Sequence, residues 1–261
     1  MDGLDISILA APLAAGLLVL LTHVPLGQQV LARGIVFIDL AIAQVAGLGV
    51  IASALLGFGS DGVVGQLAAV SAALLAALLL TFTEKHWPRV QEALIGVLFV
   101  LAASVAILLL AHDPHGGEEL KELLAGQILW VRFEQLWPAL LVSAIILAFW
   151  FRRRQPPGHL GFYALFALAV TASVQLVGVY LVFASLVVPA LGAQPWPSQL
   201  RLPVGYAIGL TGYAAGLWLS LMADLPAGAL SVLMLVLAAV VAAGIGHVFW
   251  SRRHGVRSRQ S

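Results

Sequence analysis

The sequence predicts an all-α membrane protein, a polytopic transmembrane helical bundle of about nine helices that forms a single domain over residues 1–261. Hydrophobic residues make up 61% of the chain, charged residues make up only 10%, and the mean hydropathy is +1.02. Soluble domains are nearer half apolar and about a quarter charged. The apolar residues also gather in long windows, and the basic residues fall between those windows. These features exclude a water-soluble protein.

The windows give the individual helices. Crossing about 30 Å of hydrocarbon takes roughly 20 apolar residues in a helix. Eight apolar windows follow one another along the chain, at 6–22, 36–57, 65–82, 92–111, 136–151, 161–192, 204–221 and 226–250. The 161–192 window is too long for one ordinary span, and Gly178 lies near its middle. We therefore expect two short helices there and nine helices in total.

The basic residues orient the bundle through the positive-inside rule. With an external N-terminus and nine alternating spans, eleven of the thirteen basic residues face the cytoplasm, and only Lys121 and Arg132 lie outside. Counting 161–192 as one span would put the RRR loop and the arginine-rich tail on opposite sides. We therefore predict an external N-terminus and a cytoplasmic C-terminus.

Several classes of chemistry find no support in the sequence. The absence of cysteine excludes disulfides, cysteine-ligated zinc and thiol catalysis. No Walker-type glycine loop is present, and no basic tract is dense enough to indicate nucleic acid as a partner. We expect no cofactor, and lipid as the surroundings of the helices.

Four blocks of sequence carry a resemblance to a known family, and together they cover nearly the whole chain. They are GQQVLARGIVFIDLAIAQVAGLGV (27–50), QEALIGVLF (91–99), LLAGQILWV (123–131), and VQLVGVYLVFASLVVPALGA (174–193) with ADLPAGALSVLMLVLA (223–238). In these blocks the chain resembles the integral-membrane permease of the ABC-type importers for zinc, manganese or iron.

This resemblance implies a type II ABC importer-like permease in the plasma (inner) membrane of a prokaryote. The chain would not itself be an enzyme. A separate ATP-binding cassette ATPase subunit would hydrolyse ATP, an extracellular or periplasmic solute-binding protein would deliver the ligand, and two identical copies would form the path between them. The segment that follows Pro189, about residues 190–203, would dock on the ATPase through residues that include Gln194, Trp196 and Arg201.

The second span departs from the family pattern. The family typically carries an acid and a histidine four residues apart there, and these positions are Leu40 and Gln44 in this chain. The acid stands instead at Asp39. Because Asp39 and Gln44 are five residues apart, they point about 140° apart around a helix. One helix cannot aim both side chains at one ion.

The candidate site residues leave alternatives open. Asp39 either pairs with Arg33 or caps helix ends at the membrane interface, or it lines a cytoplasmic exit or gate of the path, because a charged residue in a span needs a partner or a function. Gln44 and Gln175 either hydrogen-bond between helices or line the path. His112, Asp113 and His115 are metal-ligand types at the outer mouth, and they form either a metal site or a solvated acidic loop that concentrates cations.

The favoured function is import of a divalent transition-metal ion. A permease for a metal chelate, such as a siderophore or corrinoid, is the alternative within the same class. A secondary transporter or an orphan membrane scaffold is the alternative from a different class. A neighbouring ATPase gene and binding-protein gene would separate these classes.

Overall fold

The computed structural model describes residues 6–59, 62–110, 124, 126, 128–152 and 158–257. Within these ranges the regular structure is entirely helical. Nine α-helices are described: α1 (Ala10–Arg33), α2 (Ile38–Leu55), α3 (Gly62–His86), α4 (Gln91–Leu110), α6 (Phe133–Arg152), α7 (His159–Val177), α8 (Val179–Gly192), α9 (Ser198–Ala223) and α10 (Ala227–Arg257). Short 3-10 turns occur at Ile6–Leu9, Pro88–Val90 and Ile128–Trp130. The predicted fold class is confirmed.

Length and composition divide the described helices into two sets. Seven are long and apolar enough to cross a membrane. Two apolar stretches are shorter, namely Phe133–Phe149 within α6 and Val179–Gly192, which is α8. The 14 residues of α8 extend only about 21 Å at 1.5 Å per residue, which is less than the hydrocarbon thickness.

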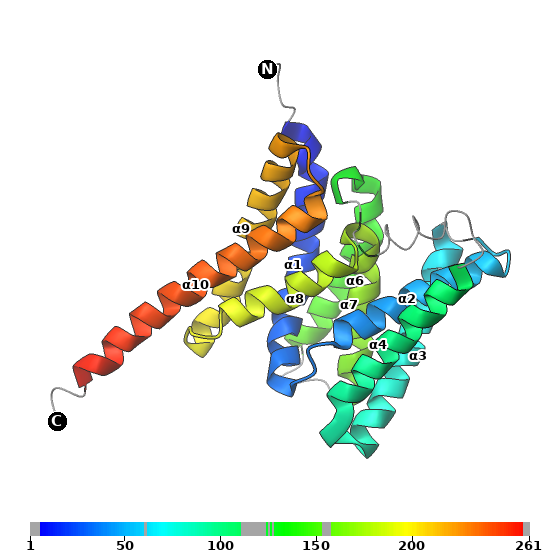
Figure 1. The fold of residues 1–261 in the computed structure, drawn as a ribbon, viewed down its shortest axis with the longest axis horizontal. Helices are drawn as coiled ribbons and strands as arrows, with labels where there is room; N and C mark the ends of the chain where they lie inside the picture. The colour runs from blue at the N-terminus through cyan, green and yellow to red at the C-terminus, as the bar shows by residue number, and fades with distance from the viewer. Residues whose placement is uncertain are drawn as a thin grey trace.

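Gly178 divides the long sixth window as predicted. Its φ of 81° lies in the left-handed region, which glycine adopts without the steric cost of a Cβ. The helix therefore ends at Val177, and a new helix begins at Val179. Figure 1 shows α8 leaving the end of α7 at a steep angle instead of continuing it.

The first helix is longer than its predicted window. That window ended at residue 22, whereas α1 continues through Pro25 to Arg33. The added segment is less apolar, so the hydropathy of the sequence did not predict it as part of the helix. Most of its residues are nevertheless buried against other helices, including His23, Val24 and Leu26. Burial therefore accounts for the extension of the helix, which ends where Gly34 adopts a left-handed φ of 69°.

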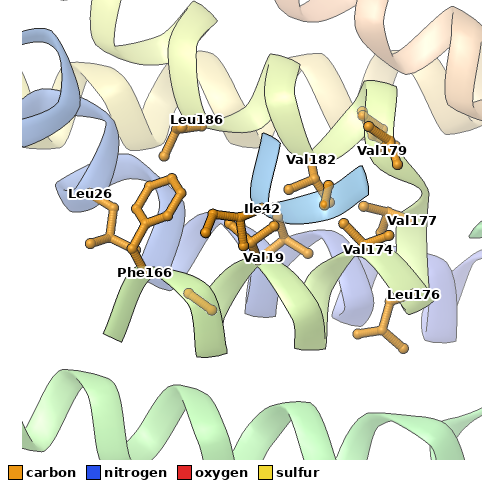
Figure 2. Close-up of a cluster of buried hydrophobic side chains, with 14 of the residues drawn as sticks. Val19, Leu26, Ile42, Phe166, Val174, Leu176, Val177, Val179, Val182 and Leu186 are labelled. Atoms are coloured by element: carbon orange, nitrogen blue, oxygen red, sulfur yellow. The ribbon is translucent and has the colours of Figure 1, made fainter. Parts of the chain in front are cut away.

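The helices gather around a central group. In Figure 1, α1, α6 and α7 lie in the middle, α9 and α10 lie on one side, and α2, α3 and α4 lie on the other. The helix α8 packs on α1 and α10, while α2 packs on α3 and α4. The core lies where α1, α2, α7 and α8 meet, and Figure 2 shows aliphatic side chains and Phe166 from these four helices gathered there.

One contact brings the backbones of α1 and α8 unusually close. A Cβ on Gly27 would overlap the carbonyl oxygen of Leu186. Small residues allow this kind of approach between membrane helices. The contact anchors α8 against α1 and so fixes one wall of the groove described below.

Candidate functional site

A groove of about 610 Å³ lies between α10 on one side of the bundle and α2 and α4 on the other (Figure 1). Residues from α2, α4, α8 and α10, together with Leu124, line it. Most of the lining is aliphatic or aromatic, and the polar groups come from Gln44 and Tyr180. The lining residues are Leu40, Gln44, Phe99, Ala103, Ile107, Leu124, Val179, Tyr180, Phe183, Ala184, Val188, Val232 and Val236.

Two positions of α2 face this groove together. Leu40 and Gln44 are four residues apart, and both line it, as expected for neighbours on one helix face. Gln44 is 3% exposed, and its Oε1 has no hydrogen-bond partner in the described part of the chain. A buried amide oxygen without a partner is costly. Gln44 therefore offers a free acceptor at the wall of the groove.

Asp39 occupies a different environment from Gln44. It is the second residue of α2, is 1% exposed, and is absent from the groove lining. Neither carboxyl oxygen has a hydrogen-bond partner among the described residues. Arg33, the partner considered from the sequence, pairs instead with Glu84.

A polar network joins the helix ends near Arg33. Arg33 Nη1 lies 3.8 Å from Glu84 Oε1, and the guanidinium carbon lies 4.2 Å from the centre of the Phe162 ring. Nδ1 of His159 hydrogen-bonds to the other Glu84 oxygen. Gln91 Nε2 donates to Tyr163 Oη at 3.1 Å. The end of α1, the end of α3 and the starts of α4 and α7 therefore meet.

This network was not predicted, because its members are far apart in the sequence. One local signal was available, since Glu84 is an acid beside Lys85 at the end of a predicted span. Glu92 also belongs to this region. Its Oε1 accepts a hydrogen bond of 3.2 Å from the backbone N–H of Phe37, which precedes α2.

The third path candidate lies away from the groove lining. Gln175 is exposed on α7, shortly before the break at Gly178. Gly126 packs against that break. It has a φ of 66°, and a Cβ there would overlap the carbonyl group of Val177. This glycine of the third block therefore lies at the junction of α7 and α8.

The metal-ligand candidates of the outer loop lie outside the described residues. This applies to His112, Asp113 and His115. Within the described ranges, no group of three or more histidine, aspartate or glutamate side chains could hold a metal ion.

The predicted docking segment comprises the end of α8, a turn at residues 193–197 and the start of α9. Pro189 is buried within α8, whereas Gln194 is exposed. Trp196 Nε1 donates a hydrogen bond of 2.9 Å to the carbonyl oxygen of Ala242 in α10. Arg201 Nε donates one of 3.1 Å to the carbonyl oxygen of Trp196. The turn is therefore fixed to both α9 and α10.

Comparisons with known proteins agree with this architecture. The sequence matches the ABC 3 transport family over residues 5–156 and 158–245. It is similar to the manganese transport system membrane protein MntC of Halalkalibacterium halodurans, with 26% identity over 279 residues that cover 98% of this chain and 91% of the relative. The fold is similar to that of PsaBC from Streptococcus pneumoniae in complex with Fab, with a TM-score of 0.72, 20% identity and 91% coverage of each chain.

The family match covers most of the chain, and the described helices include seven that could cross a membrane. ABC 3 permeases work with an ATPase and a binding protein. The chain therefore belongs to the ABC 3 transport family, as a multi-pass membrane permease subunit of a bacterial ABC import system.

Proposed function

We propose that this chain, as one permease domain over residues 1–261, carries a divalent transition-metal ion across the membrane, with manganese as the first candidate. One observation carries the assignment of the path. Leu40 and Gln44, which correspond to the acid and histidine positions of the family resemblance, line the same groove. The manganese transport named for the relative at 26% identity supports the choice of ion.

The functional form is a homodimer with the path between its copies. An ion needs a route that is closed to lipid, and the groove is bordered by an α4 that buries few of its own residues. Ile95, Ala102 and Ala106 are buried, whereas Val97 and Leu108 are exposed. A second copy facing the groove would cover this side of α4. A chemical crosslink between two α4 helices tests this arrangement.

The N-terminus lies outside and the C-terminus in the cytoplasm. The ion pair between Arg33 and Glu84 supports the alternation of the spans, because it joins the ends of α1 and α3 on one side of the membrane. The positive-inside rule assigns that side to the cytoplasm. The chain has no cysteine of its own. A membrane-impermeant maleimide should therefore label Phe58→Cys but not Gln194→Cys in intact cells, and the reverse pattern would invert the orientation.

The turn from about residue 190 to 203 docks on the ATPase. Its exposed side chains include Leu191, Gln194 and Leu200 and are both apolar and polar, which is typical of protein interfaces. Gln194→Cys should crosslink to a cysteine on the co-purified ATPase. A panel of ATPase cysteines that never reacts with it would remove this assignment.

Metal accumulation in cells tests the function as a whole. Cells that lack their own high-affinity manganese importer would express the ATPase and the binding protein, with or without this chain. We expect accumulation of radioactive manganese at low external concentration only when the chain is present. Equal accumulation in both strains would reject the proposal.

One observation favours a second cargo, a metal chelate. The groove lining contains neither carboxylate nor imidazole, and these are the groups that bind such ions directly. A chelate is bound through the shape of the cavity and through hydrogen bonds, and its size suits a cavity of several hundred Å³. Competition between free manganese and pre-formed chelates in the same uptake assay distinguishes the two cargoes.

A further inference from the structure

Trp196 connects the turn to α10 through a contact that the family resemblance does not assign. Its indole N–H donates to the Ala242 carbonyl oxygen across 2.9 Å, which is ordinary hydrogen-bond geometry. Its own backbone carbonyl accepts from Arg201 at the start of α9. The residue is half-buried and lies between Pro195 and Pro197, which restrict the backbone on either side of it.

Gly246 provides the space that this contact needs. A Cβ at Gly246 would lie 2.8 Å from Trp196 Nε1, 3.0 Å from its Cδ1 and 3.1 Å from Pro195 Cβ. These distances are too short for unstrained packing, so any larger residue would displace the indole. Gly244, two residues earlier in the same helix, has nothing within 4 Å of its own Cβ position. The steric requirement is therefore specific to Gly246.

The Trp196 contact lies on the side of α10 that carries Val232, which lines the groove together with Val236. Ala239 and Gly246 follow Val232 at intervals of seven residues, each of which turns only about 20° further around the helix. Ala242 is six residues beyond Val236, or about 9 Å along the axis. A helix is stiff over this distance, so a displacement at the turn reaches the wall of the groove.

We propose that Trp196 is a positioning residue that transmits movement of the ATPase-docking turn to the α10 wall of the groove. The inference rests on the proposed docking of this turn. When the ATPase moves the turn, the indole carries α10 with it, because both the hydrogen bond and the packing on Gly246 hold the two segments together. Without this contact, the turn moves while Val236 stays in place.

The experiment follows the groove wall itself and does not depend on the identity of the cargo. In the complex of permease and ATPase, Val236→Cys is the reporter, and its reaction rate with a small maleimide is measured with and without a non-hydrolysable ATP analogue. The permease has no other cysteine. We expect the analogue to change the rate by about fivefold or more, which is the lower end of the range that is usual for coupling between two sites.

Three further changes are made on the reporter background. Gly246→Ala and Trp196→Phe should each abolish most of the nucleotide-dependent change, because the first displaces the indole and the second keeps an aromatic ring without the N–H. Gly244→Ala, the matched control, should keep it. Retention of the full change in both Gly246→Ala and Trp196→Phe would overturn the inference. If one of the two variants fails to fold, the other decides the outcome.

A crosslink distinguishes failure of the inference from failure of the proposed function. The Gln194→Cys crosslink to the ATPase should form in all folded variants, because Gln194 is exposed and none of the variants changes it. If the crosslink forms and Gly246→Ala and Trp196→Phe both keep the nucleotide response, the role of Trp196 is rejected and the docking of the turn is not. Absence of both the crosslink and the response in the otherwise unchanged reporter chain rejects the docking turn and the inference with it.

Discussion

Restoring the family's acid and histidine in α2 should create a metal site on the groove wall. The double change Leu40→Asp with Gln44→His places a carboxylate and an imidazole four residues apart, at two positions that both line the groove. Side chains at this spacing have Cβ atoms about 5–6 Å apart. A zinc-class ion at about 2.0–2.2 Å from each ligand fits between them.

The expected change in the stability of the double variant is the sum of two opposing contributions. An acid at the centre of a membrane helix costs about 2.5–3.5 kcal/mol on insertion scales. Leu40 lies only two residues into α2, so the cost there should be at the lower end or below. A bound ion at about 100 times its Kd adds about 2.7 kcal/mol. The double variant should therefore melt at a lower temperature than the parent without metal and recover most of the loss with it.

Isothermal titration calorimetry of the purified permease with zinc and manganese measures the increase in metal affinity directly. We expect apparent binding at least about tenfold tighter than in the parent, or 1.4 kcal/mol. The control is Gln44→His alone, because the natural Asp39 is buried away from the groove lining and cannot complete the pair. A folded double variant that binds no more metal than the parent would show that this face of α2 does not border a cation path.

Two predictions concern the contacts that hold the bundle together. Gly27→Ala should lower the free energy of unfolding by about 3 kcal/mol or more, because the new Cβ overlaps a backbone carbonyl of α8, whereas Gly96→Ala, in open space, should be neutral or slightly stabilising. Equal melting temperatures for the two variants in detergent would contradict this packing. Glu84→Gln, which weakens an ion pair and a hydrogen bond at once, should cost about 1–3 kcal/mol. Glu134→Gln, whose ion pair is exposed, should cost less than about 1 kcal/mol, and an equal loss from both would refute the role of the network.

The sequence predicted the features that depend on local composition. Hydropathy located the helices, and Gly178 marked the break because a positive φ favours glycine. The five-residue spacing of Asp39 and Gln44 predicted different directions around one helix, and the groove lining includes only the second of them. Such features follow from neighbouring residues and from fixed helical geometry.

Features that depend on distant contacts could not be predicted in this way. Glu84 meets Arg33 and His159 across gaps of about 50 and 75 residues, and no periodicity links such positions. The length of α1 beyond residue 22 depends on burial against other helices, and the bond from Trp196 to Ala242 depends on the crossing of α10 over the turn. The lining of the groove also could not be predicted, because it depends on the relative positions of four helices.

ATP-dependent manganese accumulation in proteoliposomes that contain the purified permease, its ATPase and the binding protein tests the central claim most directly. Ala103→Trp fills the groove from α4, and Leu75→Trp, on the exposed surface of α3 and outside the groove lining, is the control. If the groove is the translocation path, the parent and Leu75→Trp should accumulate manganese, and folded Ala103→Trp should not. Accumulation that is absent from the parent, or that Ala103→Trp leaves unchanged, would contradict it.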